Sequence, residues 1–342
     1  MTTTATCIDG HAHVVPQSFL EEVERSARAF GVEVERTPEG HAITFPGLPR
    51  LRAAGGRLVD LEARTAWMDD EQVAVQMAGA WLDVAGYALP PDREVEWVRL
   101  LNEHLAAQTA SAGQRFRALA SVPLQNGNAA ALELEYAVNK LGVSGAMLPS
   151  DPMDIDLAAP EMEPFWEAAA SLDVPVLLHG ASHSKWRHFG PAYLGFSLGR
   201  TLDTTVLASK LLLGGLLDRH PALRLVLCHG GGALPYLIGR IEDGYQRGTD
   251  KTASLQRNGP ADYLADLYYD TVTLNARSAR LLLDTAGADH VMLGSDYVWG
   301  PMAGDFSKAA QAATGDETEW ASVRSGTAQA LFGLSAERVS PS

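Results

Sequence analysis

Short apolar runs rich in Val, Ile and Leu alternate along the chain with longer segments in which apolar residues recur every three to four positions. The short runs indicate buried strands, and the longer segments indicate helices with one apolar face. Strands that alternate with helices are typical of βα units around a parallel sheet. Eight strands are expected, at residues 5–8 leading into His11, 73–77, 116–122, 144–148, 174–178, 223–228, 267–273 and 290–293.

The segments between these strands predict an outer layer of helices. Eight βα units favour an α/β fold of the closed (β/α)8 TIM barrel type, in which the helices surround the strands. A doubly wound open sheet is the alternative, because the number of strands alone does not establish closure. Helical spacing is present at residues 58–70, 94–112, 129–141, 163–171, 201–219 and 278–285.

Residues 31–56 interrupt this alternation. They are rich in Gly, Pro and Arg and have weak periodicity, which predicts a flap inserted after the first strand and its helix. Such insertions commonly lie over the catalytic face of a barrel, whereas a plain surface loop is the alternative. No interdomain linker is visible, so residues 1–342 are expected to form a single domain that ends in a pair of packing helices after residue 305.

The composition excludes several classes of protein. Of the 342 residues, 46% are hydrophobic and 20% are charged, as in a globular enzyme rather than a disordered chain. The net charge of −15 leaves no basic surface for a nucleic acid. The two cysteines, Cys7 and Cys228, indicate no disulfide scaffold, and the chain shows neither a secretory signal nor an apolar run of about 18 residues. These features predict a cytoplasmic protein with no membrane span.

Two histidines, His11 and His13, stand at the end of the first predicted strand, in the sequence Asp-Gly-His-Ala-His. Side chains at positions i and i+2 of a strand point to the same face, so both imidazoles can reach one metal ion. The pair alone is a weak signal, and an incidental pattern is the alternative. Its position strengthens it, because barrel active sites are built at the carboxyl ends of the strands.

Three further polar residues follow buried strands in the same way. His179 ends the run VPVLLHG, His229 ends RLVLCHGGG, and Asp296 follows the last strand in HVMLGSDY. Each alone could be a satisfied core histidine or, for Asp296, a turn residue. Together with the first pair they predict a metal site, since three imidazoles and one carboxylate suit a divalent ion such as zinc and leave a position for water or substrate. His229 is a further ligand or an acid/base group.

The segments IDGHAHVVP, VLLHG, ALRLVLCHGGGALPYLIGRI and VMLGSDY resemble the amidohydrolase superfamily. Within it, the chain is similar to the metal-dependent decarboxylases typified by aminocarboxymuconate semialdehyde decarboxylase, from Ile8 to about Leu334. The resemblance implies a (β/α)8 barrel with one divalent metal, usually zinc, and a homodimeric assembly. It also implies roles for the five residues: His11, His13, His179 and Asp296 as metal ligands and His229 as the catalytic acid/base.

The resemblance bears on the substrate and on the number of metals. Superfamily members with two metals carry a lysine at the end of the fourth strand, where this chain reads GAMLPSD, so one metal is expected. Arg240 resembles an anchor for the substrate carboxylate, and a helix-surface arginine is the alternative. A second anchor is implied in the flap, where Arg50, Arg52 and Arg57 are candidates.

An aromatic pocket for a planar acid is also expected beside the metal, with packing of loops as the alternative interpretation. The chain departs from the decarboxylases here, with Gly180 after the fifth strand and Val298-Trp299 after the eighth, in place of the family's Pro and Pro-Phe. The candidate lining residues are Trp81, His183, Trp186, His188, Tyr297 and Trp299.

The favoured function is nonoxidative decarboxylation of an aromatic or unsaturated carboxylic acid, a small molecule. The metal, zinc or alternatively manganese, would orient the substrate or a bound water, and His229 would transfer the proton. A lactonase-like hydrolase, a hydratase of an unsaturated acid and a noncatalytic metal-binding protein are the alternatives. The ligand set is compatible with each of them.

Overall fold

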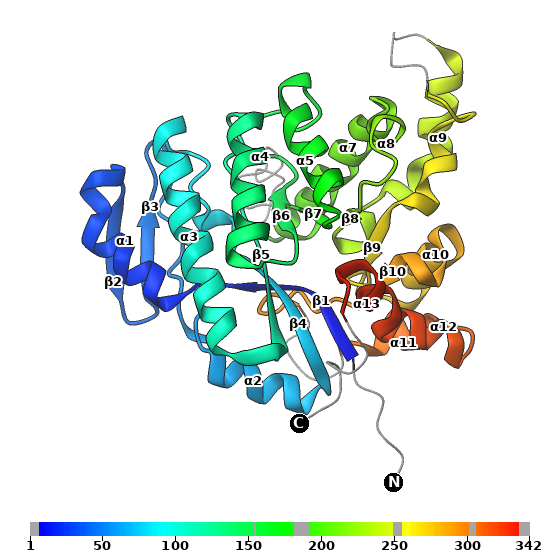
Figure 1. Ribbon diagram of the computed structural model, residues 1–342. Coiled ribbons are helices and arrows are strands. Elements are labelled where there is room, and N and C mark those ends of the chain that lie inside the picture. Colours follow the sequence, from blue (N-terminus) through cyan, green and yellow to red (C-terminus); the bar gives the residue numbers. More distant parts are fainter. Residues whose placement is uncertain (1–6, 154, 181–191, 249–254, 301–305, 335–342) are drawn as a thin grey trace.

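Eight parallel strands form the centre of the computed structural model, which describes residues 7–153, 155–180, 192–248, 255–300 and 306–334 (Figure 1). All eight predicted strands are present, and the α/β class is confirmed. The strands are β1 (Cys7–Val14), β4 (Val73–Ala80), β5 (Phe116–Leu119), β6 (Ala146–Pro149), β7 (Val176–His179), β8 (Leu225–Leu227), β9 (Tyr268–Asp270) and β10 (Val291–Met292).

The strands pair in two parallel sheets, in the orders β1-β4-β5 and β10-β9-β8-β7-β6. Backbone hydrogen bonds continue across both gaps between the sheets. Between β5 and β6, the Met147 N–H donates to the Ala120 carbonyl at 2.9 Å. Between β10 and β1, the Gly10 N–H donates to the Leu293 carbonyl at 2.8 Å, and Ala12 forms a parallel bridge with Tyr297.

Helices lie outside the strands (Figure 1). Four of them begin at a side-chain cap that accepts from backbone N–H groups of the first turn: Asp60 before α2, Asn126 before α4, Asn275 before α10 and Asp316 before α12. The helices are α1 (Gln17–Phe30), α2 (Leu61–Asp70), α3 (Pro91–Ser111), α4 (Gly127–Tyr136), α5 (Glu163–Leu172), α6 (Ala192–Leu194), α7 (Arg200–Leu213), α8 (Leu216–Arg219), α9 (Leu234–Arg247), α10 (Ala276–Ala286), α11 (Lys308–Ala313), α12 (Glu317–Ala321) and α13 (Thr327–Phe332). Within the described ranges, no helix is long and apolar enough to cross a membrane.

The predicted flap contains regular structure that the sequence did not indicate. An antiparallel hairpin, β2 (Glu33–Thr37) and β3 (Gly40–Thr44), follows α1. The returning chain pairs with β3 through reciprocal backbone hydrogen bonds between His41 and Ala54. Charged residues occupy most of β2, so its apolar pattern is too weak to predict a strand.

The apolar core consists of several clusters of buried side chains. One of them, the inner cluster, takes buried side chains from seven of the strands: Ile8, Val75, Met77, Leu119, Met147, Leu177, Val226 and Met292. The larger cluster lies between the strands and the helices. At its C-terminal end the chain adds Ala328 and Leu331 of α13 to the inner cluster. The sequence predicted two packing helices after residue 305, and the structure has three, α11 to α13.

Candidate metal centre and active site

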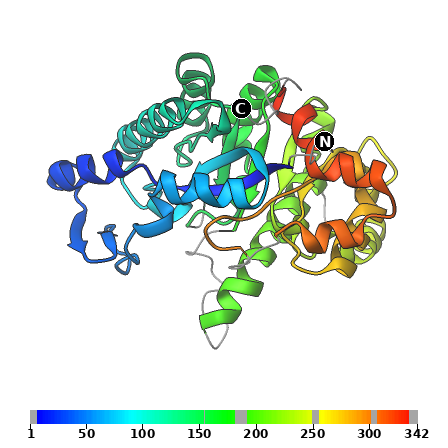
Figure 2. The same ribbon diagram turned by 90° about the horizontal axis from the view of Figure 1, so that it is seen from below.

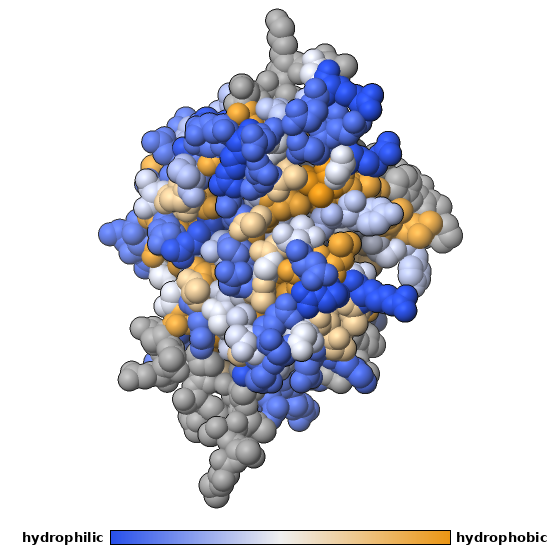
Figure 3. All heavy atoms as spheres, turned by 90° about the vertical axis from the view of Figure 1, so that its right-hand side faces the viewer, coloured by the Kyte–Doolittle hydropathy of each residue, from blue (hydrophilic) through white to orange (hydrophobic). Residues whose placement is uncertain are grey.

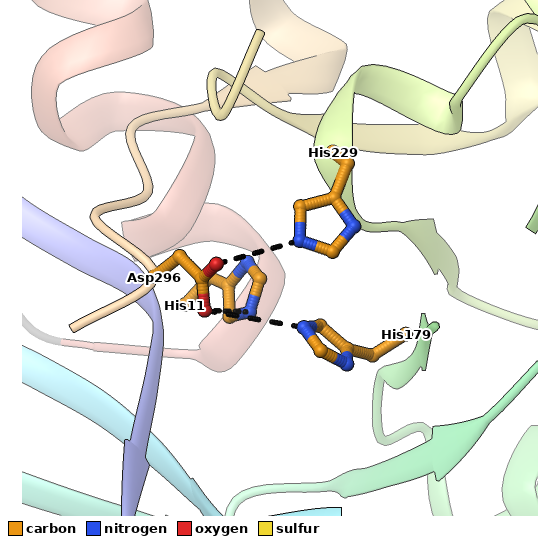
Figure 4. Close-up of side chains that lie close together, drawn as sticks. All are labelled: His11, His179, His229 and Asp296. Carbon is orange, nitrogen blue, oxygen red and sulfur yellow. Dashed lines mark ion pairs between the residues drawn. The ribbon is translucent and has the colours of Figure 1, made fainter. Parts of the chain in front are cut away.

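Five polar side chains converge at the carboxyl ends of the strands. Figure 4 shows four of them, His11, His179, His229 and Asp296. His11 and His13 lie in β1, His179 ends β7, His229 follows β8 and Asp296 lies in the loop after β10. Four of them are buried, with exposures of 0% for His11, 1% for His13, 3% for His179 and 6% for Asp296. The structure therefore brings together every residue predicted as a metal ligand or acid/base group.

The imidazole and carboxylate atoms of this cluster lie at ligand spacing. The Nε2 atom of His13 is 3.3 Å from Nε2 of His11, 3.2 Å from Nε2 of His179 and 3.2 Å from Oδ1 of Asp296. Oδ1 of Asp296 is also 3.6 Å from Nε2 of His11 and 3.9 Å from Nε2 of His179. Nitrogen ligands at about 2.0–2.1 Å from a tetrahedral zinc ion lie about 3.3 Å from one another.

Hydrogen bonding alone does not account for this arrangement. The carboxylate of Asp270 lies 2.6 Å from Nδ1 of His11, so this nitrogen carries a proton, and in the neutral imidazole, the form that binds a metal, Nε2 of His11 presents a lone pair. That lone pair faces Nε2 of His13, and Oδ1 of Asp296 is buried without a hydrogen-bond donor. Buried lone pairs that face one another repel unless a cation lies between them, so the donor set fits a divalent metal ion.

The backbone after β8 and β10 has an unusual conformation that aims two of these side chains. His229 and Asp296 both adopt positive φ angles, of 57° and 51°, which non-glycine residues seldom do. Gly230, Gly231 and Gly232 continue the same left-handed conformation, with φ of 61°, 74° and 64°. A methyl group at Gly232 would lie 2.2 Å from the carbonyl oxygen of Thr201 in α7, so glycine is required there.

Asp270, at the end of β9, orients the cluster and was not predicted from the sequence. Its Oδ2 accepts from His11, and its Oδ1 accepts from the backbone N–H groups of Gly230 and Val272, each at 3.0 Å. One carboxylate thus fixes the tautomer of His11 and holds the turn that carries His229. The available signal was an acidic residue at the end of the seventh predicted strand, in the run YYDTV.

A second network of buried hydrogen bonds holds β1 in place. The carboxylate of Asp9 accepts from the Ser295 N–H at 2.9 Å and from Gln76 Nε2 at 2.8 Å. Arg64, fully buried, donates to Gln76 Oε1 at 2.7 Å and to the His13 carbonyl at 2.5 Å. Because these bonds connect β1 to β4, α2 and the loop before Asp296, they fix the strand that presents His11 and His13.

Burial sets the protonation states of the cluster. It lowers the pKa of His13, and burial together with the neighbouring imidazoles lowers the pKa of His179 well below its ordinary value. Burial opposes the charge of Asp296, but the imidazoles of His13 and His229 outweigh it and hold the pKa of this carboxyl well below its usual range. Burial also acts to lower the pKa of His11, but the neighbouring Cys228 and Asp270 outweigh it and raise that pKa well above its ordinary value. Neutral imidazoles and an ionised carboxylate are the forms that bind metals, so a metal ion would displace a proton from His11.

His229 differs from the other histidines in its position. Its side chain is 11% exposed, and its Nε2 lies 3.6 Å from Oδ2 of Asp296, the oxygen that faces away from His13. Its ring centroid is 4.7 Å from that of His179. An imidazole at the rim of the cluster, with an edge toward solvent, is placed to exchange protons with a bound molecule.

Some of the aromatic and cationic candidates for substrate binding lie together, whereas Arg50 lies apart from them. Trp81 is buried after β4, and its ring centroid lies 5.8 Å from that of the half-buried Trp299. Arg52 of the flap lies over both rings, whereas Arg50 forms a surface ion pair with Glu35 at 2.8 Å.

The remaining candidates for substrate binding include two arginines that the structure describes and three residues that it does not. Arg57 donates to the Tyr297 hydroxyl at 3.2 Å, so it too lies at the loop after β10. Arg240 is exposed on α9 and has no ion-pair partner in the described parts of the chain. His183, Trp186 and His188 lie outside the described residues.

Comparison with known proteins gives the family. The amidohydrolase family model matches residues 8–334. The chain is 33% identical over 267 residues to a gamma-resorcylate decarboxylase of a Polaromonas species, covering 73% of this chain and 79% of that protein. It is 25% identical over 295 residues to 2-amino-3-carboxymuconate-6-semialdehyde decarboxylase of Dictyostelium discoideum, covering 85% and 81%.

A solved structure shares the fold. It is a dihydroxybenzoic acid decarboxylase of Polaromonas, with bound manganese and the inhibitor 2-nitroresorcinol. It superposes with a TM-score of 0.78 at 24% identity and covers 98% of this chain and 99% of that one. Fold, site geometry and family match agree, and the chain belongs to the amidohydrolase family.

Proposed function

We propose that the protein is a metal-dependent nonoxidative decarboxylase of an aromatic or unsaturated carboxylic acid. The observation that carries the proposal is the buried cluster of three imidazoles and one carboxylate at separations of 3.2 to 3.9 Å, with His229 beside it. Relatives of this chain are named as decarboxylases of aromatic or unsaturated acids, which supports the reaction class.

His11, His13, His179 and Asp296 would hold one divalent ion. A bound divalent ion polarises the oxygens of a substrate carboxylate and of a neighbouring hydroxyl group, which supplies the electrostatic part of the catalysis. The imidazole-rich ligand set suits zinc, and the solved relative contains manganese, so both ions belong in a metal test.

His229 would be the acid/base group. When the bond between the carboxylate and its carbon breaks, carbon dioxide leaves and the electron pair stays on that carbon. The imidazolium of His229 donates the proton that takes the place of carbon dioxide, and solvent protonates it again through its exposed edge. The carboxylate of Asp296 lies 3.6 Å from Nε2 of His229 and so faces the nitrogen that would carry this proton.

Substrate binding would fall to the residues around the mouth of the site. Trp81 and Trp299 supply aromatic faces, and Arg240 would bind a carboxylate, supplied to a neighbouring subunit. Of the flap candidates, Arg50 is engaged in an ion pair with Glu35, which favours Arg52, since Arg52 lies over the two indoles.

The finer points of the architecture belong to the same proposal. Residues 1–342 would form one domain, a closed (β/α)8 barrel, supported by the hydrogen bonds between β5 and β6 and between β10 and β1. The hairpin β2–β3 and the segment to residue 56 would be its flap. A cytoplasmic location remains a prediction, with the two free, buried cysteines as its support.

A homodimer is proposed from exposed apolar side chains. The segment of α6 and residues Gly195–Gly199 extends from the body of the molecule (Figure 2). The side that carries α9 and α10 shows apolar patches between hydrophilic ones (Figure 3). Apolar side chains exposed in this way favour contact with a second copy. Those on the extended segment are Tyr193 at 68%, Leu194 at 44%, Phe196 at 47% and Leu198 at 45% exposure.

The test is release of carbon dioxide by the protein loaded with zinc or manganese, from a panel of dihydroxybenzoates, carboxymuconate semialdehydes and lactones. Release from an aromatic or unsaturated acid supports the proposal. Ring opening of a lactone without carbon dioxide would assign a hydrolase, and addition of water to a double bond would assign a hydratase.

The variant His229→Asn separates catalysis from metal binding. We expect about a 10²- to 10⁴-fold loss of kcat with metal content unchanged, because the proton donor is lost while the four ligands remain. Elemental analysis and steady-state kinetics on the same preparation check this. Loss of the metal would instead identify His229 as a ligand.

A further inference from the structure

The contact between Arg52 and Trp299 is unusually close for a flap residue and the barrel. The guanidinium carbon of Arg52 lies 3.5 Å from the centroid of the Trp299 ring and 5.4 Å from that of Trp81. At 3.5 Å a guanidinium is at stacking distance from the indole face, where the ring attracts the cation. The stack joins the flap to the loop that carries Asp296.

Arg52 has no carboxylate within ion-pair distance among the described residues. This distinguishes it from Arg50, which pairs with Glu35, and from Arg57, which donates to Tyr297. A guanidinium that lies over an indole face can still direct N–H groups outward, in the geometry that binds a carboxylate bidentately. Asp83 and Arg200 act on Arg52 electrostatically with opposite signs, and neither forms an ion pair with it among the described residues.

Trp299 holds Arg52 through the face of its ring. The indole Nε1 is buried and has no acceptor in the described part of the chain. A backbone hydrogen bond of 2.6 Å from the Trp299 N–H to the Asp296 carbonyl fixes its position relative to the metal cluster. A phenylalanine at this position would keep an aromatic face and lose no hydrogen bond.

We propose that Trp299 is a positioning residue, which holds the guanidinium of Arg52 by a cation–π stack in the orientation that binds the substrate carboxylate. This inference rests on the proposed function for the nature of the substrate. The stack itself is a property of the ligand-free protein, so the two ideas can fail separately.

The first measurement is made without substrate. Side-chain NMR signals of Arg52 are identified by their absence in Arg52→Lys. We expect them to show the upfield ring-current shift of a group above an indole, to lose it in Trp299→Leu and to keep most of it in Trp299→Phe. Signals at unshifted positions in the wild-type protein would overturn the proposal.

The second measurement separates KM from kcat for the acid that the enzyme decarboxylates. Trp299→Leu should raise KM about ten-fold with kcat within two-fold, and Trp299→Phe should keep KM within about three-fold of wild type. Arg52→Ala should raise KM at least as much, and adding Trp299→Leu to it should cause no further increase, because the two side chains act as one unit. Additive effects, or a Phe variant as defective as the Leu variant, would contradict the proposal.

Two controls match these variants. Arg99 lies over Tyr136 at the same 3.5 Å, on α3 and α4, so Tyr136→Leu removes an equivalent stack elsewhere and should leave KM unchanged. Arg36→Ala removes a flap arginine that is paired with Glu24 and should do the same. If Trp299→Leu does not fold, Arg52→Lys tests the stack from the other side, and an unchanged KM there overturns the proposal. Absence of carbon dioxide release by the wild type would refute the decarboxylase function, while the NMR signals still decide the stack.

Discussion

At the scale of single residues, Asp270 decides which nitrogen of His11 faces the other ligands. Its Oδ2 accepts the Nδ1 proton of His11, while its Oδ1 is occupied by the N–H groups of Gly230 and Val272. A carboxylate can serve all three donors because it only accepts hydrogen bonds. An amide of the same shape cannot.

We therefore expect Asp270→Asn to weaken metal binding about 10- to 100-fold. The amide oxygen would keep the two backbone donors and turn its NH₂ group toward His11, which favours the tautomer with the proton on Nε2. Competition with a chelating dye measures the affinity. Asp284→Asn on α10 removes an exposed carboxylate paired with Arg280 and is the control. Equal affinities in the two variants would show that Asp270 does not orient His11.

A second prediction concerns Glu94 and the dependence of the unfolding free energy on pH. Glu94 is fully buried at the start of α3, where it accepts from the Leu124 N–H at 2.8 Å. Burial raises its pKa from 4.5 to about 7. The folded protein therefore holds this proton more tightly than the unfolded chain does, so the contribution of Glu94 to stability falls as the pH rises from about 4.5 through 7.

The wild type should lose about 2 to 3 kcal/mol of unfolding free energy between pH 5 and pH 8 that Glu94→Gln does not lose. The amide cannot ionise, and its oxygen can still accept from Leu124. Urea unfolding of both proteins at the two pH values measures the difference. Parallel pH profiles for the two proteins would mean that Glu94 is already ionised in the folded state at pH 5.

At the scale of elements, the turn after β8 shows how backbone conformation places a functional side chain. Four consecutive residues, His229 to Gly232, have positive φ, and the turn is packed so closely on α7 that a side chain at Gly232 has no space. Such conformations cost energy in non-glycine residues and persist where the surrounding structure enforces them. Here the enforcement comes from Asp270 and α7.

Gly232→Ala should lower stability by about 1 to 3 kcal/mol and reduce kcat, because the turn must move away from the Thr201 carbonyl and carry His229 with it. Metal content should remain, since the ligands lie on other elements. The matched control is Gly244→Ala on α9, where no atom lies within 4 Å of the added methyl group, and where alanine should be neutral or slightly stabilising. Thermal unfolding and kinetics of both variants test this. Equal effects of the two substitutions on stability and kcat would show that the turn does not position His229.

The elements also show which strands can be predicted from the pattern of apolar residues alone. Each of the eight predicted strands is present because its apolar residues are buried on both faces of the sheet, and a short continuous apolar run is typical of a strand in that environment. The hairpin β2–β3 was missed for the opposite reason. It is a two-stranded ribbon with an exposed, charged strand, so its stability comes from pairing and from contacts of β3 rather than from an apolar run.

At the scale of the whole molecule, the metal cluster connects elements far apart in the chain. Its proposed ligands come from β1, from the end of β7 and from the loop after β10, so one ion would tie both sheets together. Nε2 of His13 lies 3.3 Å from Nε2 of His11 and 3.2 Å from Oδ1 of Asp296, so these buried polar atoms are crowded at the spacing of metal ligands. The metal should therefore stabilise the fold as well as support catalysis.

Removal of the metal by a chelator should lower the melting temperature, and zinc or manganese at 100 times its dissociation constant should restore about 2.7 kcal/mol. Thermal unfolding with and without added metal measures this. His179→Ala lacks a ligand and should show a much smaller increase on addition of metal. A wild-type melting temperature that does not respond to chelation or metal would argue against binding at this cluster.

The sequence by itself determined the strands, their order along the chain and the identity of the converging histidines and Asp296. These features are local, because an apolar run predicts a buried strand, and a polar residue at its carboxyl end predicts a position at one rim of the sheet. The five site residues could be named for that reason, with the resemblance to the amidohydrolases supplying their separate roles.

Only the tertiary structure decided the partners of those residues. The contact of Asp270 with His11 joins positions 259 residues apart, and the stack of Arg52 on Trp299 joins the flap to the last loop of the ring. No periodicity indicates which of three neighbouring arginines meets an indole, because that depends on how the chain returns along β3. Contacts between distant segments arise from packing of the whole molecule, and local pattern does not encode them.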